Sequence, residues 1–272
     1  MIRESPIAGS WYPGEGKALA RQIDGFLQKA KCEDKETPFI LISPHAGYFY
    51  SGQVAAFAYK QVEGKSFDKV VIIAPSHYHP IRGAALFGSG AFRTPLGLVD
   101  IDEDICRKLI EGDNIFKDEP RAHSEEHSLE IQIPFLQRAI GNFKMVPILS
   151  IERDMKNCTR IASAIKEIAD EKTLIVASSD LSHFYNQKQA LKLDSKVIEA
   201  VKELDTEGFY QNVNSGECEA CGSTPILIAL LIAGMFPNPK SKIYCHATSG
   251  DISGDFDRVV GYLAAGLYRG KN

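Results

Sequence analysis

Four apolar segments of the chain are each followed by side chains that can bind metals or transfer protons. The segments and the side chains after them are 39–42 before His45, 70–74 before His77, 174–177 before Asp180 and His183, and 243–246 before Asp251. Each segment has the length and the β-branched content of a buried strand. Because the carboxyl ends of parallel strands meet at one edge of a sheet, we expect these side chains to converge there. Four ordinary loops with capping residues are the alternative, but three of the four endings deliver a histidine, which favours one shared site.

A second concentration of polar side chains lies between residues 123 and 130. Glu126 and Glu130 are one helical turn apart, so they would share one face of a helix. Such a pattern can bind a metal or can simply form a solvated face, but the residues that follow at 135 and 136 are apolar. We therefore expect this segment to enter the protein and to direct His127 and Glu130 into the pocket. The side chains predicted to contact a substrate are Tyr48, His79 and Glu130.

The chain has six cysteines, and only Cys218 and Cys221 form a closely spaced pair. A structural zinc site would need a second pair of cysteines or histidines nearby, and none is evident. A thioredoxin-like redox pair would open a helix after a strand, whereas residues 209–216 before this pair look like helix and turn. We therefore expect both thiols to be structural and reduced.

Composition excludes several classes of protein. The 272 residues are 44% hydrophobic and carry a net charge of −4, which supports a sizeable core and argues against a nucleic-acid surface. No apolar run is long enough to span a bilayer, and the first residues lack an apolar signal region. These features predict a soluble, cytoplasmic protein that acts on neither nucleic acids nor membranes.

Strand and helix patterns alternate along the chain. Helical periodicity of apolar residues predicts helices at 16–30, 53–61, 157–170, 189–204 and 225–234, and apolar segments of strand length occur among them. This alternation predicts a single α/β domain over residues 1–272. Its expected architecture is three α/β/α layers, with helices on both faces of a central, mostly parallel or mixed sheet.

Several motifs together resemble those of the Memo family. They agree in order and spacing over nearly the whole chain: Ala8-Gly9-Ser10-Trp11-Tyr12, Pro44-His45-Ala46-Gly47-Tyr48, Pro75-Ser76-His77, Glu126-His127-Ser128, Ser178-Ser179-Asp180 with His183, and Thr248-Ser249-Gly250-Asp251. That family is similar in fold to the class III extradiol dioxygenases, in which two histidines and an acidic residue hold Fe(II).

The resemblance implies a role for each site residue. His45 and His77 would be the metal histidines, and Asp251 would be the third ligand, at a position where animal Memo proteins carry a cysteine. His127, His183 and Asp180 would line the pocket as catalytic groups. Fe(II) is the cofactor implied first, with copper or zinc as alternatives. A neutral imidazole there could take a proton from a phenol or enediol substrate, because imidazole titrates near neutral pH.

Three functions stay open at this point. The first is a metal-dependent redox enzyme acting on a small phenolic or enediol molecule. The second is a protein that binds iron or copper without turnover, and the third is an adaptor that binds a peptide in the same pocket. The resemblance also suggests a radical SAM protein and an AMMECR-type protein as partners.

Overall fold

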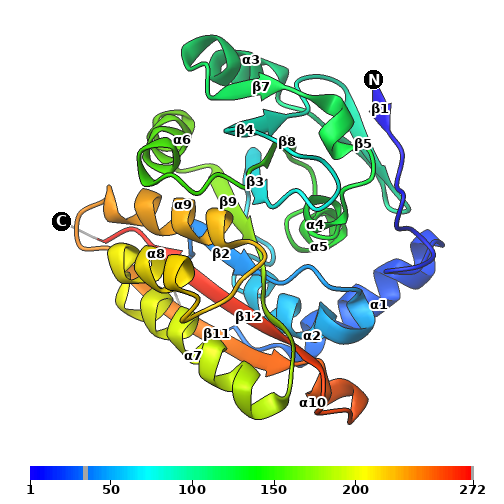
Figure 1. Ribbon diagram of the computed structural model, residues 1–272. Coiled ribbons are helices and arrows are strands. Elements are labelled where there is room, and N and C mark those ends of the chain that lie inside the picture. Colours follow the sequence, from blue (N-terminus) through cyan, green and yellow to red (C-terminus); the bar gives the residue numbers. More distant parts are fainter. Residues whose placement is uncertain (33–35, 271–272) are drawn as a thin grey trace.

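The structure is a computed structural model that describes residues 1–32 and 36–270, and a nine-stranded mixed sheet lies at its centre (Figure 1). Eight strands follow one another across the sheet: β10 (Asp180–Tyr185), β12 (Val259–Tyr268), β2 (Ile40–Ser43), β9 (Thr173–Ser178), β3 (Lys69–Ala74), β8 (Lys144–Leu149), β4 (Ala84–Leu86) and β7 (Phe116–Asp118). The ninth, β11 (Lys240–Thr248), pairs with β12. A smaller sheet contains β1 (Ile2–Arg3), β5 (Ala91–Thr94) and β6 (Gly97–Asp100).

The middle of the large sheet is parallel, as the apolar segments predicted. Strands β2, β9, β3 and β8 run in the same direction, with Ile40 paired to Ile175 and Val71 also paired to Ile175. Every residue of β2 and β9 is buried, because helices cover both faces of the sheet. The carboxyl ends of β2, β9 and β3 therefore lie side by side at one edge.

Helices form a layer on each face of the sheet, which confirms the predicted three-layer architecture (Figure 1). One layer contains α1 (Gly16–Lys29), α2 (Tyr48–Tyr59), α4 (His127–Glu130) and α5 (Ile133–Ala139), and the other contains α6 (Met155–Ile168), α7 (Gln187–Glu203), α8 (Thr206–Ser215) and α9 (Ser223–Gly234). Helix α9, which matches the helix predicted at 225–234, is apolar on nearly all sides and packs against β9, β2 and β3, so it is buried. Three short or peripheral helices complete the fold: α3 (Glu103–Gly112), the 3₁₀ helix η1 (Pro120–His123) and α10 (Gly250–Ser253).

Strand β12 separates β11 from the parallel strands. It is antiparallel to both β2 and β11, so β11 runs in the same direction as β2 but two positions away in the sheet. Neighbouring strands are about 4.8 Å apart, which puts the end of β11 about 10 Å sideways from the end of β2. Strand β10 was not predicted: it follows β9 directly and pairs with the first part of β12.

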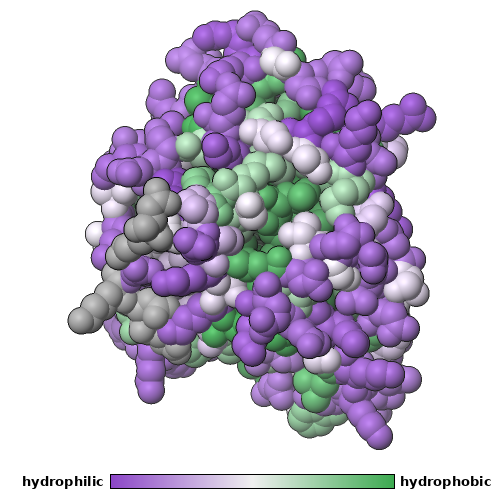
Figure 2. Space-filling view, turned by 90° about the vertical axis from the view of Figure 1, so that its left-hand side faces the viewer, coloured by the Kyte–Doolittle hydropathy of each residue, from purple (hydrophilic) through white to green (hydrophobic). Residues whose placement is uncertain are grey.

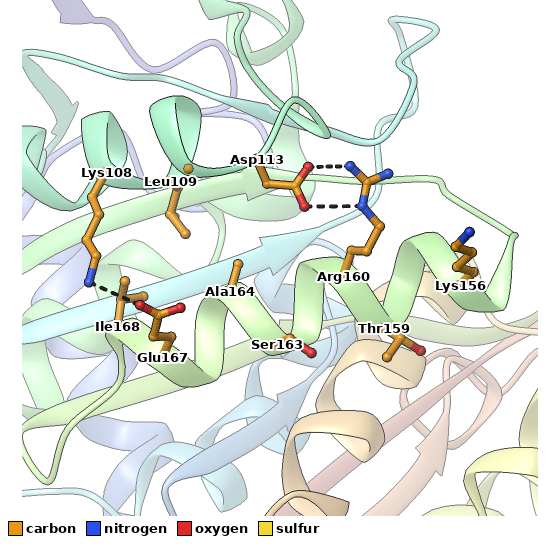
Figure 3. A pocket seen from close by; sticks show the side chains of 11 residues that line it. Lys108, Leu109, Asp113, Lys156, Thr159, Arg160, Ser163, Ala164, Glu167 and Ile168 are labelled. Atoms are coloured by element: carbon orange, nitrogen blue, oxygen red, sulfur yellow. Dashed lines mark hydrogen bonds and ion pairs between the residues drawn. The ribbon is translucent and has the colours of Figure 1, made fainter.

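Helices α3 and α6 border a groove that is distant from the histidines (Figure 3). Two ion pairs cross it, Arg160 with Asp113 and Lys108 with Glu167, and Leu109 lies buried at its floor. Four of the charged side chains drawn in the groove are therefore paired across it, whereas Lys156 at its end is drawn without an ion pair.

Figure 2 shows the face that lies on the left in Figure 1, where hydrophobic residues form a central patch framed by hydrophilic ones.

We predict that apolar burial, and not the ion pairs, holds α3 against α6. The substitution Leu109→Ala should lower the free energy of unfolding by about 2–5 kcal/mol, the usual cost of a cavity in a core. Arg160→Ala should cost at most about 1 kcal/mol, because its ion pair with Asp113 is partly exposed and screened by solvent. Urea denaturation of both variants measures these values, and a larger loss for Arg160→Ala would contradict the prediction.

Candidate metal centre

Three imidazoles meet beyond the carboxyl edge of the parallel strands. His45 follows β2, His77 follows β3, and His127 begins α4, which packs against β3. One ligand nitrogen from each ring lies within 4.8 Å of the other two. Over the described parts of the chain, this is the one group of three or more histidine, cysteine or acidic side chains with spacing suited to a metal ion. His45 and His127 are buried, whereas about 30% of the His77 side chain is exposed.

Glu126 fixes the orientation of His77. Its carboxylate is almost fully buried and accepts hydrogen bonds from the His77 backbone N–H at 2.6 Å and from His77 Nδ1 at 2.9 Å. Although burial raises the pKa of Glu126, its hydrogen bonds with His77 and Ser128 outweigh this and lower the pKa to about 2, so the carboxylate is ionised at neutral pH. An ionised carboxylate only accepts hydrogen bonds, so Nδ1 must donate, which leaves the lone pair of His77 on Nε2.

The hydrogen bonds of Ser178 fix the tautomer of His45. Its Nδ1 lies 3.0 Å from Ser178 Oγ, and that hydroxyl already donates its proton to the Ser128 carbonyl at 2.6 Å. His45 Nδ1 must therefore donate, and the lone pair lies on Nε2. The Cys221 Sγ atom is 2.9 Å from this Nε2 atom, which carries the lone pair that a metal would use, and 3.5 Å from the Asp180 carbonyl oxygen.

The surroundings of His127 indicate that the cluster of three imidazoles suits a metal cation. Its Nδ1 atom is buried and has no hydrogen-bond partner in the described structure, although it lies 3.4 Å from a Glu126 oxygen. Its ring packs against Trp11 with the ring centroids 4.3 Å apart. A buried polar atom without a partner is rare, and a third imidazole beside two with available lone pairs suits a divalent transition metal.

Burial keeps the rings of His45 and His127 neutral. Burial, followed by the neighbouring imidazoles, lowers the pKa of His45 well below its usual value, and burial lowers the pKa of His127 to about 4. Neutral imidazoles are the form that binds metals. Burial also raises the pKa of Asp180 to about 7, although the backbone N–H groups of His45 and Ala46 oppose this shift. Asp180 can therefore carry a proton near neutral pH.

A cavity of about 670 Å³ opens above the three imidazoles. Asp180 and His183 line it together with the cluster, as predicted, and Asp180 Oδ1 accepts the His45 backbone N–H at 2.7 Å. His183 comes from β10, and burial lowers its pKa. The structure thus brings five of the nine predicted site residues to one cavity: His45, His77, His127, Asp180 and His183.

The other predicted site residues do not line the cavity. Asp251 is exposed on α10, where its carboxylate accepts hydrogen bonds from the backbone N–H and the hydroxyl of Thr248. It lies outside the cluster because its carboxylate is held at Thr248, although Ser249 and Ser253 on either side of it line the cavity. His127 is the third member of the cluster instead. Tyr48 is buried and donates to the Ile131 carbonyl, Glu130 is enclosed by other side chains, and His79 is exposed outside the lining.

Glu130 belongs to a buried clamp that holds the segment carrying Glu126 and His127. Arg3 pairs with the Glu130 carboxylate and also donates to the backbone carbonyls of His123 at 2.9 Å and Glu126 at 2.6 Å. The hydroxyls of Ser5 and Tyr12 donate hydrogen bonds to the Oε1 atom of the Glu130 carboxylate. The N-terminal segment therefore supports the centre through Arg3 and covers it through Trp11.

Sequence reasoning missed the supporting contacts of Arg3, Glu126 and Cys221. Only Glu126 carried a signal, because an acidic residue directly before a candidate ligand histidine can anchor another imidazole. The contact between Cys221 and His45 joins residues 176 positions apart and has no local signature.

The comparisons with known proteins identify the family. The model of the Memo-like protein family matches residues 3–266. The chain is 33% identical to a MEMO1 family protein of Nitrosopumilus maritimus over 97% of this chain and 98% of that protein. It is 34% identical to the MEMO1 family protein MK0963 of Methanopyrus kandleri (99% and 100%) and 35% identical to a MEMO1 family protein of Thermotoga neapolitana (97% and 99%). This α/β/α chain with a cluster of histidines at its sheet edge belongs to the Memo family. No helix among its described residues is long and apolar enough to cross a membrane.

We predict that the metal-free protein loses stability as the pH falls from 6.5 towards 4. His45, His127 and His123 have folded pKa values below their usual 6.5, mainly through burial, so unfolding takes up protons in this range. Each such proton contributes about 1.4 kcal/mol per pH unit. Asp180 acts in the opposite direction, because its folded pKa of about 7 exceeds its usual 3.8.

The variant Asp180→Asn should therefore lose stability more steeply over the same range, since the opposing group is gone. Urea unfolding at several pH values measures both slopes. An equal or shallower slope in Asp180→Asn would show that Asp180 is ionised in the folded protein throughout this range.

Proposed function

We propose that this Memo-family chain binds one divalent metal ion and performs metal-dependent chemistry on a small phenolic or enediol molecule. The observation that carries the proposal is the pair of fixed tautomers, in which His45 and His77 both present Nε2 lone pairs beside His127, whose buried Nδ1 has no hydrogen bond with a described residue. We assign the ligands to His45, His77 and His127 in place of the set His45, His77 and Asp251.

Fe(II) is the proposed metal, with copper and zinc as alternatives. Three protein ligands leave coordination positions open, and imidazole suits iron, copper and zinc alike. When bound, the metal would supply Lewis-acid and redox chemistry to a substrate in the cavity. This assignment resembles the extradiol dioxygenases in its open positions but differs from their usual carboxylate ligand.

Asp180 and His183 are proposed to accept and donate protons during the reaction. Both line the cavity, and neither is needed to complete the cluster of imidazoles. His183 is neutral at physiological pH and can accept a proton from a substrate hydroxyl, and Asp180 can hold one with its pKa of about 7. A protein that only stores metal needs no such groups, so they favour catalysis over storage.

A peptide-binding adaptor is the second candidate, and one observation favours it. Phe49, Tyr50 and Phe184 line the mouth of the cavity with more than 40% of each residue exposed, and exposed aromatic residues are common in binding surfaces. The radical SAM and AMMECR-type partners and a cytoplasmic location stay predictions.

We predict one metal site per chain that Trp11 can report. This is the only tryptophan in the chain and packs on His127, so Fe(II) or Cu(II) binding should quench its fluorescence. His45→Ala, His77→Ala and His127→Ala should each weaken binding strongly, whereas Asp251→Ala should not change it. Anaerobic calorimetry and fluorescence measure this, and full affinity in the three histidine variants would contradict the assignment.

We predict that His183→Ala retains the metal but loses about 10²–10⁴-fold of the turnover, the usual contribution of a general base. Oxygen uptake by the iron-loaded protein with a panel of catechols and enediols measures turnover. His183→Gln serves as the control that keeps the size of the side chain. If the wild type turns over nothing but binds a peptide through the cavity, the adaptor function is correct instead.

A further inference from the structure

The mouth of the cavity carries one permanent positive charge. Arg258 is the only lysine or arginine among the described residues that line the cavity. It lies in the segment between α10 and β12, and its guanidinium carbon is 5.3 Å from the centre of the Phe184 ring. The guanidinium is exposed and forms no ion pair or hydrogen bond with a described residue. Its N–H donors are therefore free to bind an anion that enters the mouth.

Phe184 is held beneath Arg258 by an irregular backbone. Its φ angle is +65°, a left-handed conformation that is uncommon for residues other than glycine. His183 pairs with Val260 and Tyr185 with Val259, so two residues of β10 face one residue of β12. Such a bulge redirects side chains and often lies beside an active site. Here His183 lines the cavity and Phe184 forms part of its mouth.

We propose that Arg258 and Phe184 form a subsite for a carboxylate carried on an aromatic ring, which deepens the proposed function and rests on it. A guanidinium offers planar, paired N–H donors that match a carboxylate. Phe184, Phe49 and Tyr50 supply aromatic walls for a flat ring. The substrate class is therefore an aromatic acid whose hydroxyl groups reach the imidazoles.

Asp255 sets the balance of charge at this subsite. It lines the same mouth but is not paired with Arg258, so it would repel an anionic ligand. Removing the Asp255 charge should thus strengthen binding of an acid, and removing the Arg258 charge should weaken it. A general loss of structure at the mouth would weaken binding in both variants.

The test uses two probes that differ in charge but hardly in shape, 3,4-dihydroxybenzoate and 3,4-dihydroxybenzamide. Their affinities are measured by NMR titration of zinc-loaded and zinc-free protein, with zinc chosen because it is redox-inert. We expect the acid to bind about 10-fold or more tightly than the amide, as a charged hydrogen-bonded contact provides. Arg258→Gln should abolish this preference, Arg258→Lys should retain part of it, and Asp255→Asn should increase it.

Equal affinities for the two probes in the wild type, or an unchanged preference in Arg258→Gln, would overturn the subsite. The preference is expected with and without zinc, because Arg258 contacts the carboxylate and not the metal. Zinc content, measured in every sample, separates the two proposals. A wild type that takes up no zinc contradicts the metal centre, whereas a zinc-loaded wild type without the preference contradicts only the subsite.

Discussion

The buried carboxylate of Glu126 is the contact on which the candidate centre depends. It accepts three hydrogen bonds, from the His77 backbone, the His77 ring and the Ser128 backbone, and so joins the end of β3 to the start of α4. An unpaired buried carboxylate would be costly, so these donors must stay in place. Arg3 holds the same segment from the other side through the Glu126 carbonyl and the Glu130 carboxylate. The imidazoles are thus positioned by the folding of the N-terminal segment as well as by the sheet.

The sheet accounts for which side chains meet. Parallel β2, β9 and β3 deliver His45, Asp180 and His77 to one edge, and α4 adds His127 from the layer that covers it. Asp251 does not join them, because its carboxylate accepts hydrogen bonds from the backbone N–H and the hydroxyl of Thr248. The parallel strands and α4 therefore set the chemistry: imidazoles form the floor of the cavity, with a protonatable Asp180 beside them.

Much of this arrangement could be predicted from the sequence. The apolar segments correctly predicted the strands β2, β3 and β9, and helical periodicity correctly predicted the helices α1, α6, α7 and α9. Both patterns are local in the sequence. The absence of Asp251 from the cluster and the presence of His127 in it could not be predicted, because they depend on the bond between Asp251 and Thr248 and on the packing of α4 against β3. The contact of Cys221 with His45 and the bulge at Phe184 also arise from tertiary packing. Strand β10 was missed because it pairs only where β12 extends past β2.

The central claim is that a metal ion here is held by imidazoles and not by thiols. X-ray absorption spectroscopy of the protein loaded anaerobically with one equivalent of zinc tests it most directly. The account predicts a first shell of nitrogen or oxygen at about 2.0–2.1 Å with the multiple-scattering pattern of three imidazoles. A shell dominated by sulfur at about 2.3 Å would contradict it, since imidazole ligands contribute nitrogen alone.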